Sequence, residues 1–116
     1  MAKLSLKRVY EPRARGDGTR VLVDRLWPRG LGKDKLADVI WLKDIAPSTA
    51  LRKWFGHDPS RWSEFYARYW AELEVLPQGA EQLRQLLRQG PVTLLYASRD
   101  REQNHAVVLR DFLQSR

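Results

Sequence analysis

The sequence predicts a small α/β domain of three or two layers, with about four partly parallel strands and about four helices. The run Val92–Ala97 is almost wholly apolar, which is typical of a central strand buried on both faces of a sheet. A long helical region precedes this run and supplies the crossover that parallel strands require. Because no helix separates the first three strands, an α+β arrangement is the alternative.

Three strands are expected before the helical region, with loops rich in Gly and Pro between them. They are Leu4–Tyr10, Arg20–Arg25 and Val39–Leu42. The first loop contains Arg15-Gly16-Asp17, a tripeptide that could indicate integrin adhesion. We interpret it as a turn, because Gly-Asp-Gly favours a turn and no secretion signal is evident.

Capping signals delimit two helices in the middle of the chain. Ser48 is a good N-cap and Gly56 a good terminator, so we expect a helix between them. Asp58 then caps the next helix, with Pro59 at its first position. Apolar residues recur along this second helix at intervals of three and four: Trp62, Phe65, Tyr66, Tyr69, Trp70, Leu73 and Leu76. This spacing indicates core packing rather than a stacking platform for nucleic-acid bases.

Two further helices flank the apolar run at 92–97. One is expected from about Ala80 to Gln89, where Gly90-Pro91 stops it. The last helix is expected from about Arg101 to Gln114, with Asp100 as its cap and Gln103 as the capping-box partner.

The chain carries a formal net charge of +7, and most of its positive charge comes from arginine. Arginine suits planar, bidentate contacts with phosphate or carboxylate groups. A basic domain attracts both nucleic acids and anionic metabolites. A basic, solvated surface without a dedicated partner is an equally good interpretation of the charge alone.

Several classes of protein are excluded or disfavoured by composition. The absence of Cys excludes disulfides, thiolate chemistry and cysteine-ligated metals. No apolar run is long enough to span a membrane, and the basic N-terminal residues lack an apolar signal core, so we expect a cytoplasmic protein. The spacing of the two His fits no metal motif, and no phosphate-binding Gly loop or dinucleotide fingerprint is present. We therefore predict neither a metal site nor a cofactor.

Two polar clusters follow predicted strands and suggest a binding site. Asp24–Gly30 follows one apolar run, and Ser98–His105 follows another. In open α/β sheets ligands bind in the crevice beyond the carboxyl ends of the strands. The positive N-terminal end of the last helix would favour an anion there.

Within these clusters we assign candidate roles to individual residues. His105 and Asp24 are the candidates for acid/base catalysis. The candidate ligand-binding residues are Arg25, Trp27, Arg29, Ser98, Arg99 and Asn104. Each also has a structural interpretation: His105 could bond a loop carbonyl, Asp24 could pair with Arg99, and the Arg residues could form internal ion pairs. His57-Asp58 resembles a catalytic dyad, but capping already explains Asp58.

The chain resembles the YeaO-like family of uncharacterised bacterial proteins, part of a larger domain-of-unknown-function family. The resemblance covers nearly the whole of residues 1–116 and rests on four segments. They are Val23–Gly30, Ala46–Phe55, His57–Pro59 and Leu95–Ala106. The resemblance implies a small cytoplasmic α/β domain and no assigned activity. Other branches of the wider family carry Cys near the positions of Tyr96 and Asn104, so a thiol mechanism cannot transfer to this chain.

Three functional hypotheses follow. The first is a site at the carboxyl ends of the strands that binds a phosphate- or carboxylate-bearing small molecule or a nucleotide, with or without acid/base catalysis. The second is a nucleic-acid-binding module, whose binding would weaken steeply with salt. The third is a structural or protein-interaction domain in which the Arg and Asp clusters are internal ion pairs. The sequence favours a monomer without a membrane partner and leaves the oligomeric state open.

Overall fold

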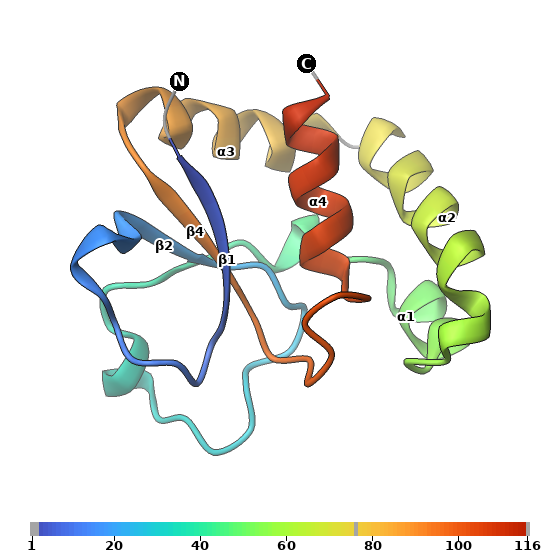
Figure 1. Cartoon of the computed structure of the whole chain (residues 1–116), viewed down its shortest axis with the longest axis horizontal. Helices are drawn as coiled ribbons and strands as arrows, with labels where there is room; N and C mark the ends of the chain where they lie inside the picture. The colour runs from blue at the N-terminus through green and yellow to red at the C-terminus, as the bar shows by residue number, and fades with distance from the viewer. Residues whose placement is uncertain (1–2, 76, 116) are drawn as a thin grey trace.

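A computed structural model describes residues 3–75 and 77–115. This part of the chain forms a four-stranded sheet in the order β1-β4-β2-β3 (Figure 1). The strands are β1 (Leu4–Arg8), β2 (Thr19–Leu22), β3 (Ile40–Trp41) and β4 (Val92–Tyr96). All three pairings are parallel, and β4 lies between β1 and β2. The predicted α/β class is confirmed, with wholly parallel pairing among these strands.

The four α-helices pack on one face of the sheet, which makes the domain two-layered (Figure 1). They are α1 (Thr49–Phe55), α2 (Trp62–Val75), α3 (Pro77–Gln89) and α4 (His105–Gln114). Alternate residues of β4 face this layer, and Val92, Leu94 and Tyr96 join its core. The aromatic stripe of α2 is part of the same core, where Phe65 and Tyr69 are fully buried. Leu76, the last residue predicted for the stripe, lies outside the described residues.

The other face of the sheet is covered by loops and short 3-10 turns rather than by α-helices. Leu22 and Leu95 point to this side and pack with Val9 and Leu36. Leu36 ends a 3-10 turn, Lys33–Leu36, in the long connection between β2 and β3. The loop predicted around Trp27–Asp34 therefore helps to cover the face of the sheet that lies opposite the α-helices.

The predicted caps of α1 are confirmed. The Ser48 side chain accepts a hydrogen bond from Leu51 N, and Gly56 is left-handed with φ 52°. Asp58 caps a short 3-10 turn, Pro59–Arg61, that leads directly into α2. Helix α3 starts at Pro77 rather than near Ala80, because proline is well tolerated in the first turn of a helix.

The predicted start of the last helix is wrong. Helix α4 begins at His105, and its N-cap is Asn104, whose Oδ1 accepts a hydrogen bond from Val107 N at 3.1 Å. Asp100 instead closes a separate turn, because its Oδ1 accepts from Glu102 N at 2.8 Å and Gln103 N at 2.9 Å. The predicted capping box with Gln103 is therefore absent from this described segment.

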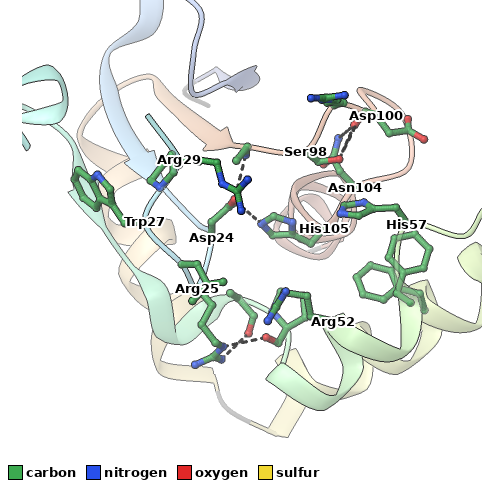
Figure 2. Close-up of a pocket in the computed structure, with 18 of the residues that line it drawn as sticks. Asp24, Arg25, Trp27, Arg29, Arg52, His57, Ser98, Asp100, Asn104 and His105 are labelled. Atoms are coloured by element: carbon green, nitrogen blue, oxygen red, sulfur yellow. Dashed lines mark hydrogen bonds and ion pairs between the residues drawn. The ribbon is translucent and has the colours of Figure 1, made fainter. Parts of the chain in front are cut away.

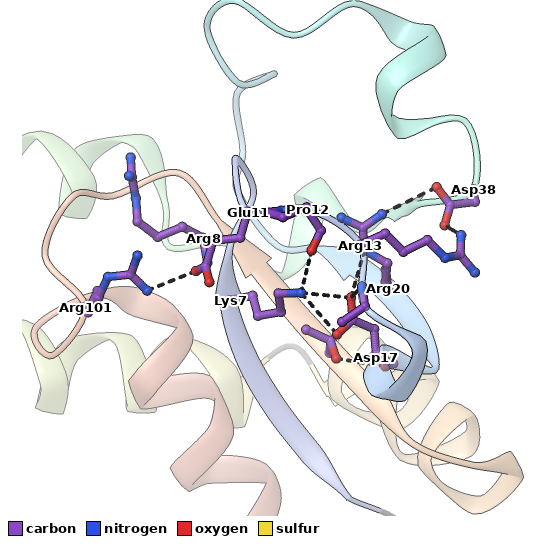
Figure 3. Close-up of polar contacts among 11 residues, drawn as sticks. Lys7, Arg8, Glu11, Pro12, Arg13, Asp17, Arg20, Asp38 and Arg101 are labelled. Carbon is purple, nitrogen blue, oxygen red and sulfur yellow. Dashed lines mark hydrogen bonds and ion pairs between the residues drawn. The ribbon is translucent and has the colours of Figure 1, made fainter.

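Asp17, in the Arg15-Gly16-Asp17 turn, is buried in a polar network beside strands β1 and β4 (Figure 3). Its Oδ2 lies 3.0 Å from Lys7 Nζ and accepts a hydrogen bond from Ala14 N at 2.9 Å. Its main-chain oxygen accepts a hydrogen bond from the Thr93 hydroxyl at 2.8 Å. Burial raises the pKa of Asp17, but the Ala14 hydrogen bond and the charges of Lys7 and Arg20 outweigh it and lower the pKa. The structural interpretation of this turn is confirmed.

This lowered pKa makes Asp17 a source of acid sensitivity. A carboxylate whose pKa is lower in the folded state stabilises the fold above its unfolded pKa of about 3.9, and that contribution is lost as the pH falls further. We expect Asp17→Asn to lower the free energy of unfolding by about 1–3 kcal/mol at neutral pH. The variant should then lose less stability than the wild type between about pH 7 and about pH 3. Urea unfolding at both pH values checks this, with the exposed Asp34→Asn as control. Equal acid losses in the wild type and Asp17→Asn would contradict the prediction.

No helix in residues 3–75 or 77–115 combines the length and the apolar character needed to cross a lipid bilayer.

Candidate functional site

A cavity of about 800 Å³ opens at the carboxyl ends of β2 and β4 (Figure 2). The loop after β2, the loop after β4 and the first residue of α4 line one part of it. Helix α1, the corner that follows it and the segment Ala46–Pro47 line another part. The chain from the end of β1 adds Tyr10.

Every residue predicted for the site lines this one cavity. These residues are Asp24, Arg25, Trp27, Arg29, Ser98, Arg99, Asn104 and His105. They meet because parallel strands end at the same edge of the sheet. The sequence reasoning did not assign Arg52 and His57, which also line the cavity.

Asp24 and His105 form a pair at the base of the cavity. His105 Nε2 lies 2.9 Å from Asp24 Oδ1, and both side chains are largely buried, at 15% and 17% exposure. Asp24 Oδ2 accepts a hydrogen bond from Ala97 N at 3.1 Å, so this carboxylate also ties β2 to β4. The suggested pairing of Asp24 with Arg99 is wrong, because His105, the first residue of α4, occupies that position instead.

The surroundings of His105 define its tautomer. Nε2 lies 3.1 Å from Val23 O as well as 2.9 Å from Asp24 Oδ1. Both neighbours are acceptors, so Nε2 carries the proton in the neutral ring. The hydrogen is aligned with Val23 O, and Asp24 Oδ1 has no aligned donor in the described structure. Nδ1 is then the nitrogen available to act as an acceptor.

Two arginines hold the walls of the cavity through main-chain carbonyls. Arg25 donates from Nε to Pro47 O at 3.2 Å and from Nη2 to Ala46 O at 3.1 Å. Arg8, at the end of β1, donates to Ala97 O at 3.2 Å and Ser98 O at 2.9 Å. These bonds fix the loop before α1 and the loop after β4 in place.

Three other arginines on the cavity are exposed and free. The guanidinium groups of Arg29, Arg52 and Arg99 make no ion pair and no hydrogen bond within residues 3–75 and 77–115. The main chain at Arg29 is held, because its carbonyl accepts a hydrogen bond from the Tyr10 hydroxyl at 2.9 Å. Together with Arg25, four arginines face two aspartates, Asp24 and Asp100, across this cavity. The site is therefore electropositive.

The loop between β4 and α4 is rigidly built. Ser98 Oγ accepts a hydrogen bond from Asp100 N at 3.2 Å, and Asn104 Nδ2 donates to Asp100 O at 2.8 Å. The pKa of Asp100 is lowered, chiefly by hydrogen bonds from Gln103 N and Glu102 N and to a smaller extent by the charge of His57. Asn104 is almost fully buried, so its side chain serves the loop and the helix start.

Trp27 contributes mainly to packing. Its Nε1 donates to Leu31 O at 2.6 Å, and its ring meets that of Trp41 edge-on at 5.2 Å. Figure 2 shows Trp27 on the opposite side of the cavity from His57.

His57 and Asp58 do not act as a pair. Asp58 Oδ1 accepts hydrogen bonds from the main chain and the hydroxyl of Ser60, as capping requires. The His57 ring is exposed and lines the cavity instead. Within residues 3–75 and 77–115, no three His, Cys, Asp or Glu side chains are placed to hold a metal ion.

Comparison with known proteins places the chain in a family. A family model described as the inactive DUF488-N3 subclade matches residues 3–116. The chain belongs to this DUF488-N3 subclade. It is 46% identical to the uncharacterised protein YeaO of Escherichia coli over 112 residues, which cover 97% of each chain. It is 45% identical to the uncharacterised protein Rv3073c of Mycobacterium tuberculosis over 114 residues, or 98% of this chain and 96% of that protein.

The YeaO-like membership predicted from the sequence is thus confirmed. No solved structure matches the chain. The domain is one of unknown function.

Proposed function

We propose that this domain binds a small molecule bearing phosphate or carboxylate groups in the cavity at the carboxyl ends of β2 and β4. One observation carries the proposal: three exposed guanidinium groups without a protein partner converge on one cavity. Elsewhere in the described chain most arginines are used in ion pairs. Examples are Arg13, Arg20, Arg61, Arg68, Arg88, Arg101 and Arg110.

The rest of the cavity supports an anion. The first turn of α4 lies at its base, and the N-terminal end of a helix favours negative charge. Arg8 and Arg25 hold the surrounding loops through main-chain carbonyls, so the site is organised before any ligand arrives.

We propose binding rather than turnover. Asp24 and His105 would carry any acid/base step, and the free Nδ1 of His105 is suited to accept a proton. The description of the subclade as inactive agrees with the absence of turnover in this proposal. On this proposal the Asp24–His105 pair positions the start of α4.

Titration calorimetry with inorganic phosphate tests the proposal. We expect Arg29→Ala, Arg52→Ala and Arg99→Ala each to weaken phosphate binding by about tenfold, because each removes a charge-assisted hydrogen bond worth about 1.5 kcal/mol. Arg15→Ala is the matched control, since Arg15 is exposed and lies outside the cavity.

Two outcomes would contradict the proposal. If none of the three cavity variants weakens binding more than Arg15→Ala, the site is elsewhere. If a single-stranded oligonucleotide binds instead, with an affinity that falls steeply as salt is added, the nucleic-acid hypothesis is favoured.

A further inference from the structure

His57 stands out among the residues of this cavity because of its backbone. It follows Gly56, the left-handed residue that ends α1, and is itself left-handed with φ 58°. Within residues 3–75 and 77–115 it is the one residue other than glycine with a positive φ. Glycine and asparagine adopt this conformation more easily than histidine does. The backbone conformation at this corner therefore does not require histidine, since asparagine would adopt it as readily.

The imidazole nitrogens of His57 have no hydrogen-bond or ion-pair partner in the described structure. Its ring contacts Phe55 at a centroid distance of 5.9 Å, and Phe55 stacks on the buried Phe65 at 4.2 Å. The neighbouring Asp58 is occupied in capping. Figure 2 shows His57 on the α1 side of the cavity, facing the loop that carries Asp100.

The other histidine differs in each of these respects. His105 is largely buried, and its Nε2 faces Asp24 Oδ1 and Val23 O. His57 is exposed and its ring nitrogens are free to meet a ligand. Histidine is the side chain whose charge ordinarily changes between about pH 5 and about pH 8.

We propose that His57 binds the anion as an imidazolium, so that ligand binding is coupled to protonation of this ring. This inference rests on the proposed function of the cavity. The gain in positive charge makes the site prefer a dianion, such as phosphate or sulfate, over a single carboxylate. His57 is then a specificity-determining residue, whereas the sequence had suggested it only as part of a His57-Asp58 dyad.

The charged and titratable groups around His57 come from several elements. On its own corner and on α1 they are Arg52 and Asp58, and across the cavity they are Arg29, Arg99, Asp100, Asp24 and His105. The pKa values of Asp58 and Asp100 are both lowered, in each case chiefly by local hydrogen bonds. These two carboxylates therefore stay ionised over the range in which histidine changes charge, as the arginines do.

Calorimetry with inorganic sulfate tests the inference, since sulfate remains a dianion throughout this range. We expect the wild type to bind sulfate about fivefold more tightly at about pH 5.5 than at about pH 8, a difference typical of a partly exposed charge pair. Titrations in two buffers of different ionisation enthalpy should show proton uptake. His57→Asn should abolish both effects while the protein still folds, because asparagine tolerates the left-handed conformation and only an exposed ring contact with Phe55 is lost.

The controls separate this inference from the proposed function. If the wild type binds neither sulfate nor phosphate at any pH, the proposed function fails. If the wild type binds but His57→Asn keeps the same pH dependence, the cavity binds anions and the role of His57 is wrong. If His105→Asn rather than His57→Asn abolishes proton uptake, the proton resides on the other histidine and the inference is again wrong.

Discussion

Replacing Gly18 by alanine is expected to lower the free energy of unfolding by about 3 kcal/mol or more, since backbone strain and a steric clash add together. Gly18 has φ 65° and ψ −138°, a conformation that residues with a Cβ rarely adopt. A Cβ at this position would lie 2.2 Å from Pro91 O. The same oxygen accepts a hydrogen bond from Thr19 N at 3.0 Å, where β2 begins to pair with β4. The substitution therefore displaces the start of the central strand pair.

Gly16→Ala is the matched control for this prediction. Gly16 lies two residues earlier in the same turn, and a Cβ there has no neighbour within 4 Å. We expect this control to change stability by less than about 0.5 kcal/mol, as most exposed substitutions do. Urea unfolding of both variants measures the difference. Equal stability of Gly18→Ala and Gly16→Ala would mean that the turn into β2 is built differently.

Asp24→Ala is expected to destabilise the fold by about 2–3 kcal/mol, because it removes a charged acceptor of hydrogen bonds from a largely buried position. It leaves Ala97 N without its acceptor and removes the carboxylate beside His105 Nε2. The melting temperature should fall by on the order of 10 °C. Asp44→Ala, an exposed aspartate away from this cavity, serves as control and should melt like the wild type.

The same variant separates a binding domain from a purely structural one. The free guanidinium groups of Arg29, Arg52 and Arg99 remain in Asp24→Ala. Phosphate should therefore raise the melting temperature of the variant as well as that of the wild type, since a ligand that binds only the folded state stabilises it. If Asp24→Ala melts at a lower temperature than the wild type but phosphate stabilises neither protein, the Arg and Asp clusters have a structural role only.

The location of the candidate site at the carboxyl ends of the strands could be predicted from the sequence, and so could most of its residues. Apolar runs followed by Asp24–Gly30 and Ser98–His105 indicated two strand ends, and parallel pairing brings such ends together. The partner of Asp24 could not be predicted in the same way. It depends on where α4 starts, and Asp100 and Asn104 both carry good capping side chains. The start at Asn104 places His105 beside Asp24.

The sequence did not place Arg52 and His57 at this cavity, for a different reason. Both lie in or just after α1, far along the chain from either strand-end cluster. Their approach to the cavity depends on how α1 packs against α2, with Phe55 of α1 stacked on Phe65 of α2 at 4.2 Å. A local signal for His57 did exist, since it follows a helix-ending glycine and precedes the Asp58-Pro59 cap.

Chemical-shift mapping by NMR tests the central claim most directly. Isotopically labelled protein would be titrated with inorganic phosphate at low and at moderate salt. We predict saturable shifts confined to residues 24–30, 52–57 and 97–105, which persist at moderate salt. Shifts spread over the basic surface and erased by salt, or no shifts at all, would contradict an anion site in this cavity.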